Sequence, residues 1–116
     1  DSHLIQNMIR KTIEKMGIEC EVFKNGKEVM DALSQKGIDI DDIGLIITDI
    51  EMPVMDGLEL LSKLQKDKYK IIPVVVNINM ANPSIAKKSE DLGAKHVIYK
   101  LDINDIEDIV IKYIRD

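Results

Sequence analysis

The chain has 116 residues, 45% hydrophobic and 32% charged, which is the composition of one folded domain and excludes a disordered polypeptide. Its net charge of −5 argues against nucleic acid or an anionic membrane surface as a partner. No apolar run approaches the roughly 20 residues of a membrane-spanning helix, and the first residues lack the apolar stretch of a signal peptide. We therefore expect a cytoplasmic protein without membrane insertion.

The chain opens with a predicted helix followed by a predicted strand. Residues 2–16 place apolar side chains at helical spacing, and Gly17 ends the pattern. Residues 18–23 alternate apolar and polar side chains with period two, which predicts a half-exposed strand. The single Cys20 lies in this strand, and we expect it to be a buried thiol without chemistry.

The next segments predict a second helix, an acidic loop and a buried strand. Residues 27–36 return to helical spacing, and residues 39–42 are acidic. Residues 43–48 form a continuous apolar run that ends at Asp49. Such a run is typical of a strand that is covered on both faces of a parallel sheet.

The second half of the chain continues the alternation of helices and strands. Helices are predicted over residues 57–67, 83–92 and 103–115, and strands over residues 71–77 and 95–99. The last helix has the clearest apolar face, with apolar side chains recurring every three or four residues.

Strands that alternate with helices of this length predict an α/β fold, a doubly wound parallel sheet. We interpret residues 1–116 as one domain. Because such a sheet normally begins with a strand and this chain begins with a helix, we expect a first strand upstream of residue 1. That strand would make the sheet five-stranded, and a further domain could precede it.

Polar groups at the carboxyl ends of the strands are the candidate site, since ligands of doubly wound sheets bind there. Asp1 precedes the first helix, Asp49 closes the apolar run and Lys100 follows the last strand. The two carboxylates suit Mg²⁺, which prefers oxygen ligands, and Lys100 suits an anion. The structural alternatives are a helix cap for either aspartate and an ordinary surface position for the lysine.

The segment 48–57, with the sequence TDIEMPVMDG, resembles the phosphorylation-site loop of response-regulator receiver domains, whose fold is flavodoxin or CheY-like. In that family the acceptor aspartate is followed by Met-Pro and then by Met-Asp-Gly, which opens the next helix. The resemblance covers essentially the whole chain and includes further segments: Asp1-Ser2, Ile72 to Val76, Leu92 to Ala94, and Lys100.

The resemblance implies a phosphoacceptor of a two-component system. Asp49 would take a phosphoryl group from a phosphohistidine of a sensor histidine kinase, and Lys100 would contact that group. Asp1 and Asp49 would bind Mg²⁺ through carboxylates, and Glu51 through its backbone carbonyl. The Glu51 side chain would add negative charge beside the site, and we expect it to modify the rate.

Two positions depart from the family pattern. Receivers usually carry a Ser or Thr at the end of the fourth strand, and counting from both sides gives Ile78 at that position. Asn77 or Asn79 could substitute if the register slips by one. Where many receivers have a Tyr or Phe that turns inward on activation, this chain has Val97.

The residues after the lysine suggest a narrower relationship. Leu101 follows Lys100, whereas most receivers have a proline there. Together with the Asp-Ile-Glu-Met-Pro string, this resembles the receiver half of the CheV chemotaxis coupling proteins, which carry an N-terminal CheW-like domain. That resemblance implies the kinase CheA as phosphodonor, and a receptor array or a downstream signalling protein as the output partner.

Two other functions remain open. A pseudo-receiver that acts only as an interaction module would fit Ile78 and Val97. A haloacid-dehalogenase-like phosphatase would share the strand-end aspartate and the lysine, but it needs a second aspartate where Glu51 stands. On the predicted output surface, we expect His96 to be exposed without a role and Tyr113 to belong to the core.

Overall fold

The protein is represented by a computed structural model that describes residues 2–23, 25–35, 39–49, 57–65, 67–78 and 82–114. The chain divides into two compact units. The smaller unit combines residues 1–22 with residues 101–116, and the larger unit spans residues 23–100.

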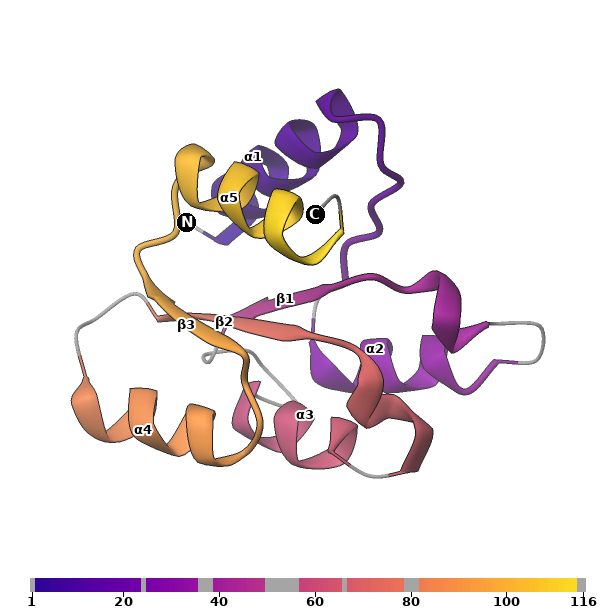
Figure 1. Ribbon diagram of the computed structural model, residues 1–116, viewed down its shortest axis with the longest axis vertical. Helices are drawn as coiled ribbons and strands as arrows, with labels where there is room; N and C mark the ends of the chain where they lie inside the picture. Colours follow the sequence, from indigo (N-terminus) through magenta and orange to yellow (C-terminus); the bar gives the residue numbers. More distant parts are fainter. Residues whose placement is uncertain are drawn as a thin grey trace. The chain divides into compact units, whose positions relative to one another are not determined.

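The smaller unit contains two helices that pack against each other, α1 (Ser2–Lys15) and α5 (Ile103–Tyr113) (Figure 1). A capping box begins α5: the Asp105 N–H donates to the Asp102 carboxylate, and the Asp102 N–H donates to the Asp105 carboxylate, each at 3.0 Å. The buried side chains of α5 are Ile106, Ile109 and Val110. Their positions i, i+3 and i+4 lie on one face of a helix, as the apolar pattern of the sequence predicts. Both predicted helices are therefore confirmed, and Tyr113 is half-buried.

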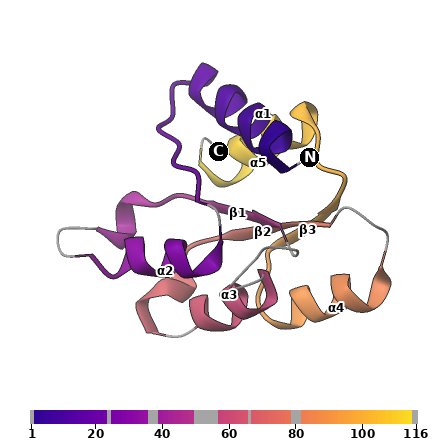
Figure 2. The same cartoon turned by 180° about the vertical axis from the view of Figure 1, so that it is seen from behind.

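The larger unit is built on a parallel sheet of three described strands in the order β1-β2-β3: β1 (Ile46–Asp49), β2 (Val74–Ile78) and β3 (His96–Tyr99). Three helices lie on one face of this sheet: α2 (Gly26–Leu33), α3 (Gly57–Leu64) and α4 (Pro83–Asp91) (Figures 1 and 2). The predicted parallel α/β arrangement is confirmed.

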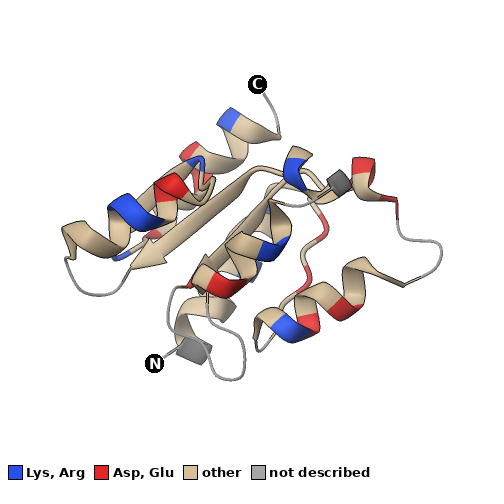
Figure 3. Cartoon of the chain, turned by 90° about the horizontal axis from the view of Figure 1, so that it is seen from below, with Lys and Arg blue, Asp and Glu red and all other residues tan. Residues whose placement is uncertain are grey.

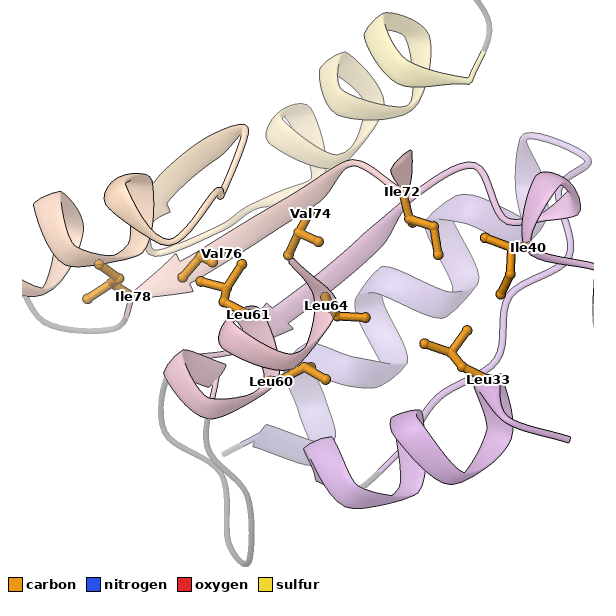
Figure 4. Close-up of a cluster of buried hydrophobic side chains, with 9 residues drawn as sticks. All are labelled: Leu33, Ile40, Leu60, Leu61, Leu64, Ile72, Val74, Val76 and Ile78. Carbon is orange, nitrogen blue, oxygen red and sulfur yellow. The ribbon is translucent and has the colours of Figure 1, made fainter. Parts of the chain in front are cut away.

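A hydrophobic cluster fills the space between the sheet and the helices of this unit. Alternate residues of β2 supply Val74, Val76 and Ile78, because successive side chains of a strand point to opposite faces. Figure 4 shows Val74 and Val76 beside the leucines of α3, and the remaining members come from α2 and two connecting segments. The other six residues of the cluster are Leu33, Ile40, Leu60, Leu61, Leu64 and Ile72. Burial of each such side chain contributes about 1.5–3 kcal/mol to folding.

The strand predicted at residues 18–23 is not formed, and these residues have no regular secondary structure. Alternation of apolar and polar side chains indicates which ones would face a core, but a strand also requires a neighbour whose backbone groups pair with it. In the described sheet β1 pairs only with β2, so no strand occupies its other side. Cys20 is half-buried, and burial, with Glu14 as the next cause, raises the pKa of its thiol. That environment favours the inert thiol expected from the sequence.

The connecting segments also differ in detail from the prediction. The acidic loop contains a 3₁₀ turn, η1 (Ile40–Asp42), whose first turn is capped by the Asp39 carboxylate. A second 3₁₀ segment, η2 (Asp67–Ile71), precedes β2, and this strand therefore begins three residues later than predicted. The local hydrogen bonds of these turns satisfy backbone groups that a longer strand would have to pair with a neighbour.

Charged residues of both signs lie on each of the helices α2, α3 and α4 (Figure 3). On α2, Lys27 and Asp31 form an ion pair of 3.2 Å. The helices of this unit therefore do not form a basic surface of the kind that binds nucleic acid. Among the described helices, none has the length and apolar character needed to cross a membrane.

Candidate functional site at the carboxyl edge of the sheet

Asp49 is the last residue of β1, and a neighbouring side chain on β2 holds its carboxylate. The register pairs Asp49 with Asn77, and Asn77 Nδ2 donates a hydrogen bond of 2.8 Å to Asp49 Oδ1. Asp49 is half-buried, whereas Asn77 is only 2% exposed. Residues that are paired in a parallel sheet point their side chains to the same face, so the strand register itself produces this contact.

The two side chains lie on the face of the sheet opposite the hydrophobic cluster. Val76 and Ile78 belong to that cluster, and Asn77 stands between them in the strand. Because side chains alternate, Asn77 points away from α3, and Asp49 shares its face. Ile98 of β3 is paired with Asn77 and completes a row across the three strands. The polar pair is therefore separate from the packing that stabilises the α3 side.

The contact is charge-assisted, since it joins an amide donor to a carboxylate. A buried amide without a partner would cost about 1–3 kcal/mol, and among the described residues every buried side-chain nitrogen and oxygen has a hydrogen-bond partner. The opposite orientation of the amide would bring its oxygen against a carboxylate oxygen. Because two acceptor oxygens repel each other, the amide is oriented so that its nitrogen donates to Asp49.

Lys100 follows β3 directly, and its backbone is tied to β2. Its N–H donates to the Ile78 carbonyl oxygen at 3.0 Å, and its φ of +53° is in the left-handed region. The side chain is exposed, and its Nζ lies 5.4 Å from the centroid of the Tyr99 ring. No ion pair joins Lys100 to Asp49. Lys100 thus has its backbone at the predicted edge, while its ammonium group contacts an aromatic ring instead of the carboxylate.

The remaining predicted site residues lie outside the part of the chain that the structure describes. These are Asp1, Glu51 and the alternative amide Asn79. The described residues contain no group of three His, Cys, Asp or Glu side chains that could hold a metal ion. The carboxylate of Asp49 has the hard oxygen atoms that Mg²⁺ prefers, so it fits the predicted ion. The roles of Asp1 and Glu51 as its partners stay predictions.

The sequence offered Asn77 only as an alternative to the missing hydroxyl, and its hydrogen bond to Asp49 was not predicted. Counting along the chain pointed to Ile78, and that side chain belongs to the hydrophobic cluster and is 8% exposed. The usable signal was an amide side chain in an otherwise apolar run, because a strand interior holds a buried amide only where it finds a partner. Val97 packs against the hydrophobic cluster, and His96 is exposed as expected.

Comparison with known proteins agrees with this architecture. Residues 1–111 match the family described as response regulator receiver domain. The chain is 31% identical to the chemotaxis protein CheV1 of Helicobacter pylori over 115 residues, which is 98% of this chain and 36% of that protein. It is also 31% identical to the DNA-binding transcriptional regulator NtrC of Escherichia coli over 94 residues, 81% of this chain and 19% of that protein. The chain thus spans about a third or less of the length of these relatives.

Solved structures share the same fold. The phosphorylated cyanobacterial phytochrome response regulator RcpA superposes with a TM-score of 0.83 at 25% identity, covering 97% of this chain and 88% of RcpA. The chemotaxis protein CheY4 of Vibrio cholerae superposes with a TM-score of 0.79 at 21% identity, covering 95% and 89%. These likenesses confirm the predicted CheY-like fold. The chain belongs to the response regulator receiver domain family.

Proposed function

We propose that Asp49 accepts a phosphoryl group from a phosphohistidine of a sensor histidine kinase, in a chemotaxis signalling pathway. The observation that carries this proposal is the half-buried carboxylate of Asp49 at the end of β1, held by Asn77. Membership of the receiver family supports the phosphoacceptor role, and the similarity to chemotaxis protein CheV1 supports the pathway.

The reaction transfers the phosphoryl group from one nucleophile to another. An oxygen of Asp49 forms a bond to phosphorus while the bond from phosphorus to the imidazole nitrogen breaks, and the imidazole keeps that electron pair. A carboxylate is a weak nucleophile, so the rate depends on alignment and on neutralising the phosphoryl oxygens. Mg²⁺ bound by Asp49, Asp1 and the Glu51 carbonyl would supply part of that positive charge.

Lys100 would supply the rest of the charge. Its four-carbon stem is flexible, and its contact with the Tyr99 ring is of the kind that contributes about 0.5–1 kcal/mol at an exposed site. A phosphoryl group with two negative charges offers a stronger partner. Rotation of the Lys100 side chain away from the ring and toward Asp49 is therefore inexpensive.

The similarity to a chemotaxis protein supports a proposal for the partners of the receiver. By similarity to the CheV protein, the phosphodonor would be CheA, and a CheW-like domain would connect the receiver to a receptor array. The receiver would act in the cytoplasm and would catalyse only its own phosphorylation and dephosphorylation. Glu51 would adjust the rate of these two reactions.

Intact-mass measurement tests the phosphoacceptor role. Incubation with acetyl phosphate and Mg²⁺ is expected to add the mass of one phosphoryl group to the wild type and nothing to Asp49→Asn. Asp31→Asn is the matched control, because Asp31 is exposed on α2 and pairs with Lys27. An equal mass gain in Asp49→Asn, or no gain in any protein, would contradict the proposal.

A pseudo-receiver is the second candidate, and two observations favour it. The Lys100 ammonium group contacts Tyr99 instead of Asp49, and Ile78 has no hydroxyl for a phosphoryl group. This candidate predicts no mass gain in the wild type with either acetyl phosphate or a phosphorylated histidine kinase. Transfer of label from the kinase to Asp49 would eliminate it.

A further inference from the structure

We propose that Asn77 is a positioning residue that shortens the lifetime of the phosphorylated state. This inference rests on the proposed phosphorylation of Asp49 and assigns to the Asn77 amide a role in the reverse reaction. Asn77 holds Oδ1 of Asp49, so Oδ2 forms the bond to phosphorus. When that bond breaks, the amide stabilises the charge that returns to the carboxylate.

The hydrogen bond from Asn77 to the Asp49 carboxylate reaches the oxygen Oδ1. Asn77 Nδ2 lies 2.8 Å from Asp49 Oδ1, and the backbones of the two residues are paired across β1 and β2. Both ends of the contact are therefore fixed by the strand ladder rather than by a loop. Asn77 is 2% exposed, so water does not readily replace its amide as donor.

The strength of this hydrogen bond depends on the charge of its acceptor. In the unphosphorylated protein Oδ1 belongs to a carboxylate, and a hydrogen bond to a charged group is roughly twice as strong as one between neutral groups. In the aspartyl phosphate Oδ1 is the carbonyl oxygen of an acyl phosphate, which carries less charge. The amide therefore stabilises the unphosphorylated state more than the phosphorylated state.

The transition state decides which rate changes. Phosphoryl transfer passes through a loose transition state, in which the bond to the carboxylate oxygen is largely broken and the carboxylate carries most of its charge. In hydrolysis, a water oxygen bonds to phosphorus, the bond between phosphorus and Oδ2 breaks, and its electron pair returns to the carboxylate. The water proton passes to the released phosphate or to solvent. The Asn77 hydrogen bond strengthens along this step and speeds it.

In the forward direction the effect is smaller, because the carboxylate is charged both before attack and in the loose transition state. The amide therefore affects the two rates unequally. From the difference between charged and neutral hydrogen bonds, we expect about a five- to tenfold effect on dephosphorylation.

Asn77→Leu tests the inference, because leucine has nearly the shape of asparagine and no donor. The protein is phosphorylated with acetyl phosphate and Mg²⁺, the donor is removed, and the decay of the phosphorylated mass is followed. The half-life is expected to lengthen about five- to tenfold, and the phosphorylation rate to change by a smaller factor. A purely structural role for Asn77 predicts slower phosphorylation and no longer half-life.

Val75→Ala is the matched control. Val75 lies on the same strand and the same face as Asn77, is fully buried and has no polar group. Its substitution is expected to lower stability without lengthening the half-life. If the wild type is phosphorylated and Asn77→Leu decays at the wild-type rate, the role of Asn77 is refuted. If the wild type is not phosphorylated, the proposed function itself fails.

A second measurement uses the wild type and does not depend on the folding of a variant. The side-chain amide of Asn77 is followed by ¹⁵N–¹H NMR before and after addition of acetyl phosphate and Mg²⁺. Its hydrogen-bonded proton is expected to shift upfield as the acceptor changes from carboxylate to acyl phosphate. Asn25 is the reference, because its side-chain oxygen caps α2 by accepting from the Glu28 N–H. An Asn77 signal that moves no more than that of Asn25 would contradict the inference.

Discussion

The ammonium group of Lys100 lies 5.4 Å from the centroid of the ring of its neighbour Tyr99. This contact competes with the role that the sequence predicts for the lysine, since no ion pair joins the ammonium group to Asp49 in the conformation that places it over the ring. Tyr99 is 51% exposed, so the pair forms near solvent, where such a contact contributes about 0.5–1 kcal/mol. A contact of this free energy is weak enough for a phosphoryl group on Asp49 to displace the ammonium group from the ring. It is also large enough to change the phosphorylation rate measurably.

Removal of the Tyr99 ring is expected to speed phosphorylation. Tyr99→Leu leaves Lys100 without its aromatic partner, and we expect the rate with acetyl phosphate and Mg²⁺ to rise about two- to fivefold. Tyr99→Phe keeps the ring and serves as the matched control, with a rate close to that of the wild type. Equal rates in the Leu and Phe variants would show that the ring does not restrain Lys100.

The left-handed backbone at Lys100 is expected to lower the stability of the fold. An L-residue in this conformation is disfavoured by about 1–2 kcal/mol, a cost that glycine avoids, although glycine loses more entropy on folding. We expect Lys100→Gly to be more stable than Lys100→Ala by about 1 kcal/mol in urea unfolding. Both variants lose the ammonium group and should be phosphorylated more slowly than the wild type. Equal stability of the two variants would mean that the φ of +53° carries no strain.

Loss of the capping box is expected to destabilise α5. Asp102→Ala removes the acceptor of the Asp105 N–H and should lower the free energy of unfolding by about 1 kcal/mol. Asp108→Ala, which removes an exposed carboxylate of the same helix outside the cap, should change stability by less. Thermal unfolding of the three proteins followed by circular dichroism gives the comparison. A larger loss for Asp108→Ala would show that charge rather than capping governs this helix.

The thiol of Cys20 is expected to react slowly with alkylating reagents. Burial raises its pKa, and the negative charge of Glu14 adds to the effect, so less thiolate is present at any given pH. The rate of alkylation by iodoacetamide should therefore reach half its maximum at a higher pH than for a free cysteine. Glu14→Gln should shift that midpoint to lower pH, with Glu19→Gln as the control, because Glu19 is not among the charges that raise this pKa. A midpoint at or below that of free cysteine would contradict the pKa direction.

The sequence predicted the helices and the central strands because their apolar residues recur with the period of the element. The apolar run before Asp49 and the apolar face of α5 are examples, and both are formed. The predicted strand at residues 18–23 failed because periodicity does not reveal whether a pairing partner is present. The strand-end position of Asp49 was likewise predictable, since β1 ends there.

The contacts between side chains of different strands could not be read from the sequence. Counting from the family pattern led to Ile78, whereas the contact to Asp49 depends on the register that pairs it with Asn77. Register is fixed by hydrogen bonds between strands that are distant in the sequence. The rotamer of Lys100 depends in the same way on competition among partners in space, which the spacing of residues does not encode.

Two neighbouring positions of β2 serve the site in different ways. The side chain of Asn77 contacts the carboxylate on one adjacent strand, and the backbone oxygen of Ile78 anchors the lysine that follows the other. A displacement of β2 along its axis by a single residue would therefore misplace the amide and the lysine together. The register of β2 therefore determines the positions of both the amide and the lysine. A substitution designed to alter the role of either group would have to preserve this register.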